Sequence, residues 1–168
     1  MVKLPVLFIR TNGATEKMEK GLIGTHVVTQ IGILVNDIEK TCQKYAEFLG
    51  VENPGFKITN VYNETRTEFK GKPTAARAKL AFFKVGENLS IELIEPDHQP
   101  STWRESLDKN GEGVHHIAFV INGMKEKIVN LEKKGMPLLQ KGDYKGGRYA
   151  YMDCEKDLKL IVELLEND

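Results

Sequence analysis

The sequence predicts an α+β fold in which two similar modules pair their sheets. Segments 30–37 and 116–123 each contain an apolar strand and a polar turn, and an amphipathic helix follows each of them. The two copies are related by a constant offset of 86 residues. Both halves then continue with strand-like segments that end in a Glu among aliphatic residues. Because each module alone is too small to bury a good core, we expect one domain with a curved sheet.

This repeat divides the chain into four consecutive parts. We predict an N-terminal arm at residues 1–25, a first module at 26–98, a linker helix within 99–112 and a second module at 113–168. The arm carries one strand-like run, Val6–Ile9, which predicts either an added edge strand or a disordered segment.

In the first module, a strand that begins at Gln30 leads into a helix that starts after Asn36. Apolar residues recur at helical spacing from Ile38 to Leu49, and Gly50 is expected to end the helix.

The rest of the first module is predicted to be a hairpin preceded by an irregular segment. Residues 78–85 and 89–95 alternate as two strands around a Gly86-centred turn. Residues 55–79 contain a turn signal at 71–73, and we expect a strand and a mobile active-site loop there.

The linker is predicted to be a helix that opens with a capping box of Thr102 and Glu105 and stops at Asn110. In the second module, a helix runs from Met124 to Gly135. Two strands are expected to follow it, at 147–153 and 158–165, separated by a polar turn.

Composition excludes several classes of function. The 168 residues include 24 Lys and Arg against 24 Asp and Glu, and the pI of about 6.9 offers nothing to attract nucleic acid or an anionic membrane. The apolar run Leu4–Ile9 is too short for a signal peptide or a membrane span, so we expect a cytoplasmic protein. Cys42 and Cys154 lie in no metal-binding spacing and are predicted to be buried or idle thiols.

The functional signal is a set of polar residues in strands that otherwise look buried. Glu92 and Glu163 each lie among aliphatic neighbours, and Gln30 and His116 begin the two matched strands. A strand Glu taken singly more often faces solvent on an antiparallel sheet. A buried carboxylate, however, must be paired, protonated or metal-bound. Because the four residues match in pairs between the modules, they indicate one metal site inside the curved sheet.

The run GVHHIAF at 113–119 resembles the metal-binding strand of methylmalonyl-CoA epimerases, in which the second His of the pair is a ligand. Residues 91–96 and 160–166 resemble two further ligand strands. The chain is thus similar, over about residues 27–166, to the glyoxalase or vicinal-oxygen-chelate superfamily. This resemblance implies paired βαβββ modules that form a curved mixed sheet with helices outside, around one divalent metal ion.

The resemblance places the metal ligands on Gln30, Glu92, His116 and Glu163, with His26 as the alternative first ligand. Epimerases usually have His where this chain has Gln30, whereas the set of Gln, Glu, His and Glu resembles zinc-dependent glyoxalase I. An extradiol dioxygenase would need a second His. Three oxygen ligands and one imidazole suit one ion of Zn, Ni, Co or Mn per chain.

The chemistry implied by the resemblance is proton abstraction next to a metal-bound carbonyl. Glu163 is the expected base, and Glu92 the group that serves the other face of the carbon. We expect an isomerase or lyase like methylmalonyl-CoA epimerase, acting as a homodimer on an acyl-CoA, a ketoacid, a keto-sugar or a thiol adduct. The alternatives are a lactoylglutathione lyase of the glyoxalase I type and a metal-free resistance-type binding protein.

Other polar and aromatic residues are weaker candidates. Two carboxylates could act as a second acid or base, three arginines could clamp an anionic substrate, and one tryptophan is expected to pack its helix. Of the remaining histidines, one should point to the opposite strand face and one should lie in a loop. These residues are Glu64 and Glu68, Arg77, Arg104 and Arg148, Trp103, His115 and His98.

Overall fold

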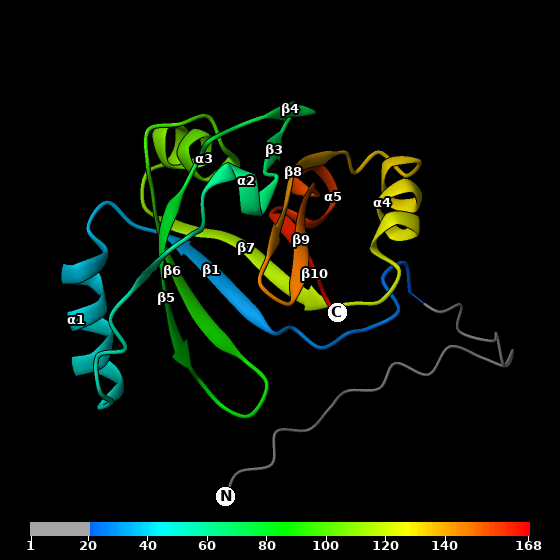
Figure 1. Cartoon of the computed structure of the whole chain (residues 1–168). Helices are drawn as coiled ribbons and strands as arrows, with labels where there is room; N and C mark the ends of the chain where they lie inside the picture. Colours follow the sequence, from blue (N-terminus) through cyan, green and yellow to red (C-terminus); the bar gives the residue numbers. More distant parts are fainter. Residues whose placement is uncertain (1–20) are drawn as a thin grey trace, which may run out of the picture.

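The computed structural model describes residues 21–168, and within them it forms one ten-stranded mixed sheet that curls around a central space (Figure 1). The strand order is β2-β5-β6-β1-β7-β10-β9-β8-β3-β4. The strands are β1 (Gln30–Leu34), β2 (Lys57–Ile58), β3 (Glu68–Phe69), β4 (Lys72–Pro73), β5 (Ala78–Lys84), β6 (Ser90–Pro96), β7 (Gly113–Val120), β8 (Leu138–Tyr144), β9 (Gly147–Asp153) and β10 (Ile161–Asn167). The helices are α1 (Ile38–Leu49), α2 (Tyr62–Thr65), α3 (Thr102–Asn110), α4 (Met124–Glu132) and α5 (Glu155–Leu158).

The two modules meet at the centre of the sheet, where β1 and β7 pair antiparallel with Ile31 opposite Ile117. These two residues are separated by the sequence offset of 86, so an approximate two-fold relation passes between them. On either side of this pair, β6 lies parallel to β1, and β10 lies parallel to β7. The predicted α+β fold of paired modules with a curved sheet is confirmed.

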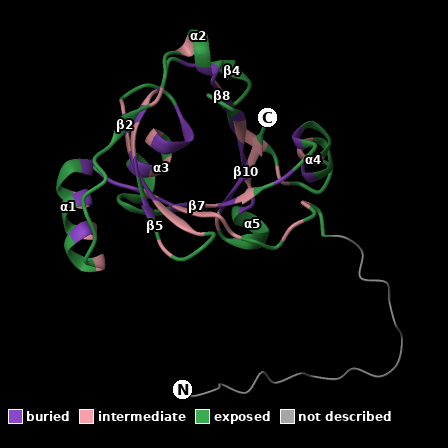
Figure 2. Cartoon of the chain, turned by 60° about the horizontal axis from the view of Figure 1, so that its bottom comes forward, coloured by how far each residue is buried: buried purple, intermediate pink, exposed green. Residues whose placement is uncertain are grey.

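Helices α1 and α4 lie on the outside of the curl, one over each module (Figure 2). Under α1 the core contains Ile38, Leu93 and the free thiol of Cys42, and under α4 it contains Leu131 and Cys154. Both cysteines are buried, as predicted. The third helix, α3, packs against the inner side of the sheet instead of the outer side. Its Trp103 and Leu107 form one cluster with inward-facing residues of the strands. That cluster is made of Leu34, Ala78, Ile94, Trp103, Leu107, Tyr151 and Ile161.

The helix starts differ from the prediction by one residue. Asp37, and not Asn36, caps α1, since its side chain accepts from the backbone N–H of Lys40. Similarly, the hydroxyl of Ser101 accepts from Arg104 N and replaces the expected capping box of Thr102 and Glu105. The end of α1 is as predicted, because Gly50 adopts a φ of 67°, which favours glycine.

The second module contains the third strand that a βαβββ order requires, at a position that the sequence analysis did not predict. β8 reads LLQKGDY, which lacks a sustained apolar alternation, yet it pairs along its length with β9. The predicted polar turn at 155–157 is the short helix α5, so the final strand starts at Ile161, three residues later than expected.

One carboxylate ties each outer helix to the strand that bears a candidate ligand. Glu95, three residues after Glu92, accepts from Ile38 N at the start of α1 and pairs with Lys79. Glu166, three residues after Glu163, accepts from Met124 N at the start of α4. A carboxylate near a helix N-terminus is stabilised by the exposed N–H groups and the helix dipole. Both modules therefore use the same anchor.

The segment between β2 and β5 crosses from one edge of the sheet to the other. β2 pairs with β5 at the first edge, and β3 pairs with β8 near the opposite edge. The Thr74 hydroxyl fastens this segment to the carbonyl of Pro100, and Lys70 pairs with Glu105 of α3. The irregular segment thus contains short strands, and it joins the two edges of the curled sheet.

Most of the predicted N-terminal arm, including Val6–Ile9, lies outside the described residues. Among residues 21–168, none of the helices has both the length and the apolar character that a bilayer span requires.

Candidate metal centre and its cavity

Three of the four predicted ligands converge on the inner face of the sheet. Glu92 comes from β6, His116 from β7 and Glu163 from β10, and each offers a ligand atom within 4.8 Å of the other two. His116 Nε2 lies 3.1 Å from Glu163 Oε2 and 3.4 Å from Glu92 Oε2. The three residues are only 6%, 0% and 4% exposed. The alternative that these strand carboxylates face solvent is therefore wrong.

The ligand atoms of this group would be satisfied by a metal ion, whereas they do not form hydrogen bonds with one another. Glu92 Oε2, His116 Nε2 and Glu163 Oε2 have no hydrogen-bond partner among the described residues, although they lie close together. Leaving buried polar atoms unpaired is costly unless another group satisfies them. Two carboxylate oxygens and one imidazole nitrogen are ligands that Zn²⁺ and similar divalent ions accept.

Burial and mutual charge shift the protonation of the group when no ion is bound. Burial raises the pKa of Glu92, and the charge of Glu163 raises it further, whereas the nearby His116 opposes the rise. Burial by itself lowers the pKa of His116, but the nearby negative charges of Glu163 and Glu92 outweigh it and raise that pKa to about 9. A proton on His116 therefore occupies the place that a cation would take.

Gly32, on β1 opposite His116, makes room for the imidazole. A Cβ atom at this position would lie 2.0 Å from His116 Cε1 and 2.4 Å from its Nδ1, so any side chain there would displace the ring. Gly32 was not among the predicted site residues. An isolated glycine inside an apolar strand is, however, a recognised sign of close approach by another group.

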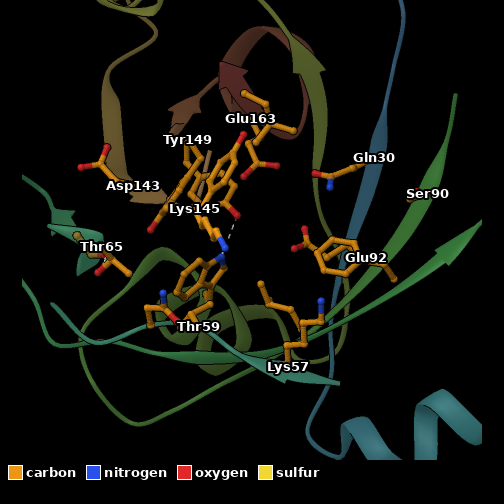
Figure 3. A pocket seen from close by; sticks show the side chains of 18 of the residues that line it. Gln30, Lys57, Thr59, Thr65, Ser90, Glu92, Asp143, Lys145, Tyr149 and Glu163 are labelled. Carbon is orange, nitrogen blue, oxygen red and sulfur yellow. Dashed lines mark hydrogen bonds between the residues drawn. The ribbon is translucent and has the colours of Figure 1, made fainter. Parts of the chain in front are cut away.

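The predicted first ligand, Gln30, lies on β1 and lines the same cavity as Glu92 and Glu163. The ends of these three side chains turn toward one region of the cavity (Figure 3). His26, the alternative first ligand, is exposed on the segment before β1 and does not line the cavity. Gln30 is thus the better placed of the two.

His115 does not point away from His116 as predicted. The register between β1 and β7 shifts after Gly32, so that Ile33 pairs with Val114 and His115 is left as the extra residue of a bulge. The bulge brings the two imidazoles together, with their Nδ1 atoms 3.0 Å apart. Strand alternation fails here because a bulge places neighbouring side chains on the same face. Burial, and then the charge on His116, lower the pKa of His115 to about 3.

A cavity of about 620 Å³ opens over the carboxylates, a size that suits a small-molecule ligand. One wall is aromatic and consists of Trp103, Tyr149 and Tyr151, in which the indole N–H of Trp103 donates to the hydroxyl of Tyr151. Lys57 and Lys145 line the cavity from the two modules. Trp103 therefore both packs α3, as expected, and borders the site. The segment that joins the sheet edges contributes Thr59, Asn60, Thr65, Thr67 and Ala76.

Trp103 lines the cavity and His115 lies against His116, but the other weaker candidates do not line the cavity, and the loop residue His98 is exposed. Glu64 accepts a hydrogen bond from Asn60, and Glu68 pairs with Lys141. The three arginines make other contacts: Arg77 donates to the backbone of Thr59, Arg104 pairs with Asp108, and Arg148 pairs with Glu166. Their partners hold them in the scaffold, so an arginine clamp on the substrate has no support from their positions.

Comparison with known families agrees with this geometry. Residues 29–151 match the model of the Glyoxalase/Bleomycin resistance protein/Dioxygenase superfamily. The chain belongs to this superfamily. It is also 30% identical over 139 residues to the uncharacterized protein YqjC of Bacillus subtilis (strain 168). The aligned region covers 81% of this chain and 89% of that protein.

Solved structures share the fold at lower identity. A Streptomyces coelicolor methylmalonyl-CoA epimerase variant, in complex with 2-nitronate-propionyl-CoA, matches with a TM-score of 0.58 at 23% identity, over 84% of this chain and 94% of that one. The methylmalonyl-CoA epimerase from Mycobacterium tuberculosis matches with a TM-score of 0.55 at 21% identity, over 90% and 93% of the two chains. The resemblance inferred from the sequence is confirmed at the level of superfamily and fold.

Proposed function

We propose that this chain is a metal-dependent isomerase that moves a proton on a carbon next to a carbonyl, in the manner of an epimerase. The observation that carries the proposal is the convergence of Glu92, His116 and Glu163, with unpaired buried ligand atoms, at the floor of a cavity. Gln30 would complete the set of ligands. A divalent ion bound there supplies a Lewis acid that stabilises negative charge on a substrate oxygen.

The residues of the chain would then handle the proton. Glu163 is the proposed base, since its carboxylate is buried and lines the cavity, and its Oε2 has no hydrogen-bond partner among the described residues. Glu92 approaches from the other module and would return a proton to the opposite face of the carbon. An inversion needs a group on each face, and the two modules provide one each.

The cavity supports an acyl-CoA as the substrate class. Both structural neighbours described above are methylmalonyl-CoA epimerases, and one of them is in complex with 2-nitronate-propionyl-CoA. In this chain the cavity has an aromatic wall, and Lys57 and Lys145 bring positive charge to it. Cationic side chains of this kind would attract the phosphates of CoA.

Metal analysis and isotope exchange test the proposal together. Protein purified without chelator or nickel resin should contain about one divalent ion per chain, and His116→Ala should lose most of it. With methylmalonyl-CoA in D₂O, the wild type should incorporate deuterium at the acidic carbon. Glu163→Gln should slow this exchange by about 10²–10⁴-fold.

Glu68→Gln is the matched control, because it changes a strand carboxylate that lies outside the cavity and pairs with Lys141. It should keep both the metal and the exchange. Protein that takes up no ion after dialysis against Zn²⁺, Ni²⁺, Co²⁺ or Mn²⁺ would contradict the proposal and favour a metal-free binding protein. Metal binding without exchange into any acyl-CoA would contradict the substrate class alone.

A further inference from the structure

His115 is a buried histidine that the proposed chemistry does not use. It is 5% exposed and occupies the bulge of β7, and its Nδ1 lies 3.0 Å from Nδ1 of His116. Without the bulge, strand alternation would turn this ring to the opposite face. The irregularity of the strand thus has one definite result, which is contact between the two imidazoles.

The orientation of His116 determines what this contact can be. Its Nε2 faces Glu92 and Glu163, so Nδ1 is the nitrogen that remains for a second partner. A nitrogen that binds a metal uses its lone pair, and a neutral imidazole then carries its single hydrogen on the other nitrogen. His116 would therefore carry that hydrogen on Nδ1, where the atom within hydrogen-bond distance is Nδ1 of His115.

We propose that His115 is a positioning residue whose Nδ1 accepts the Nδ1–H of His116 and thereby holds Nε2 of His116 toward Glu92 and Glu163. The acceptor role requires the neutral His115 ring to carry its own hydrogen on Nε2. Metal-binding histidines are generally oriented by such an acceptor, most often a carboxylate or a carbonyl. Here a second histidine takes that place. The inference rests on the proposed metal site, but it adds a residue outside the ligand set.

The competing explanation is packing alone. The His115 ring also contacts the ring of Tyr151, with centroids 5.3 Å apart, so its removal could loosen the site without any role for a hydrogen bond. Two variants of nearly equal shape separate these roles. His115→Asn keeps an acceptor at the place of Nδ1, whereas His115→Leu has the same branching and no acceptor.

The affinity for Zn²⁺, measured in competition with a chromophoric chelator, is the first readout. His115→Leu should bind Zn²⁺ about 10–100-fold more weakly than the wild type, and His115→Asn should recover most of that loss. Thermal unfolding of the metal-free variants should show that both are folded at the temperature of the titration, so that their Zn²⁺ affinities can be compared directly. Equal Zn²⁺ affinities for the two variants would overturn the proposal, whether both are strong or both are weak.

A second readout uses the wild type and needs neither metal nor variants. Two-bond ¹H–¹⁵N correlation spectra report which ring nitrogen carries the hydrogen in each histidine. His115 should be the Nε2–H tautomer, and His116 should show an Nδ1–H that exchanges slowly with water. Hydrogen on Nδ1 of His115 would overturn the proposal, even if the variants do not fold. Wild-type protein that binds no Zn²⁺ would instead contradict the proposed function, and the spectra would still decide the role of His115.

Discussion

The imidazole of His116 lies where a side chain at position 32 would have to be. We therefore expect Gly32→Ala to push the ring away from Glu92 and Glu163, because Ala adds a Cβ 2.0 Å from His116 Cε1. Crowding of this kind costs about 1–3 kcal/mol of folding stability. Zn²⁺ affinity should fall about tenfold or more, as measured by chelator competition.

Gly21→Ala is the control for this substitution, since nothing lies within 4 Å of a Cβ at Gly21. It should leave both Zn²⁺ affinity and unfolding temperature unchanged. Wild-type affinity in Gly32→Ala would mean that the position of the ring is not what limits metal binding.

Protonation of His116 should make metal binding depend on pH. The carboxylates raise the pKa of His116 to about 9 in the metal-free protein, so at pH 7 the ring is charged and must lose a proton before Nε2 can bind an ion. Affinity for Zn²⁺ should therefore rise with pH between about 6 and 8, by roughly tenfold per pH unit. Calorimetry in buffers of different ionisation enthalpy should count about one proton released per ion.

The dependence on buffer should disappear in His116→Ala, where any residual Zn²⁺ binding displaces no imidazole proton. Wild-type binding whose heat is the same in every buffer would show that His116 is already neutral.

At the scale of the elements, the outer helices are fixed to the ligand-bearing strands by Glu95 and Glu166. Each follows its candidate ligand by three residues, so it occupies the opposite face of the strand and reaches the helix that covers that face. Strand alternation already predicted that Glu92 and Glu95 lie on opposite faces, but not that Glu95 would accept from the first residue of α1. Only the direction of each side chain distinguishes the helix anchor from the site residue.

We expect Glu95→Ala to lower stability by about 1 kcal/mol, because Ile38 N loses its acceptor and Lys79 loses its partner. For a chain of this size the unfolding temperature should drop by about 2–4 °C. Differential scanning calorimetry measures the change, and Glu52→Ala in an exposed loop serves as the control. An unchanged unfolding temperature would mean that the anchor at α1 contributes nothing to stability.

At the scale of the whole molecule, the candidate centre joins the two modules. Gln30 and Glu92 belong to the first module, and His116 and Glu163 belong to the second, so one chain provides all four. A bound ion would therefore connect the halves of the sheet across the β1–β7 junction.

This connection predicts strong stabilisation by metal. At a free Zn²⁺ concentration 100-fold above the Kd, the folded state gains about 2.7 kcal/mol. The unfolding temperature should rise by about 5–10 °C as one cooperative transition. A scan in which only one of two separate transitions moves would show that the ion binds one module alone. His116→Ala should show almost no shift at the same Zn²⁺ concentration.

The sequence by itself determined the module repeat, the helices over 38–49 and 102–110, and the pairing of candidate ligands across the repeat. These features depend on local periodicity, caps and offsets, which a chain carries along its length. The structure decided the placement of β8, the bulge at His115 and the close approach at Gly32, and it separated Gln30 from His26. Such features arise from the register between distant strands, and register is a property of contacts that local patterns do not encode.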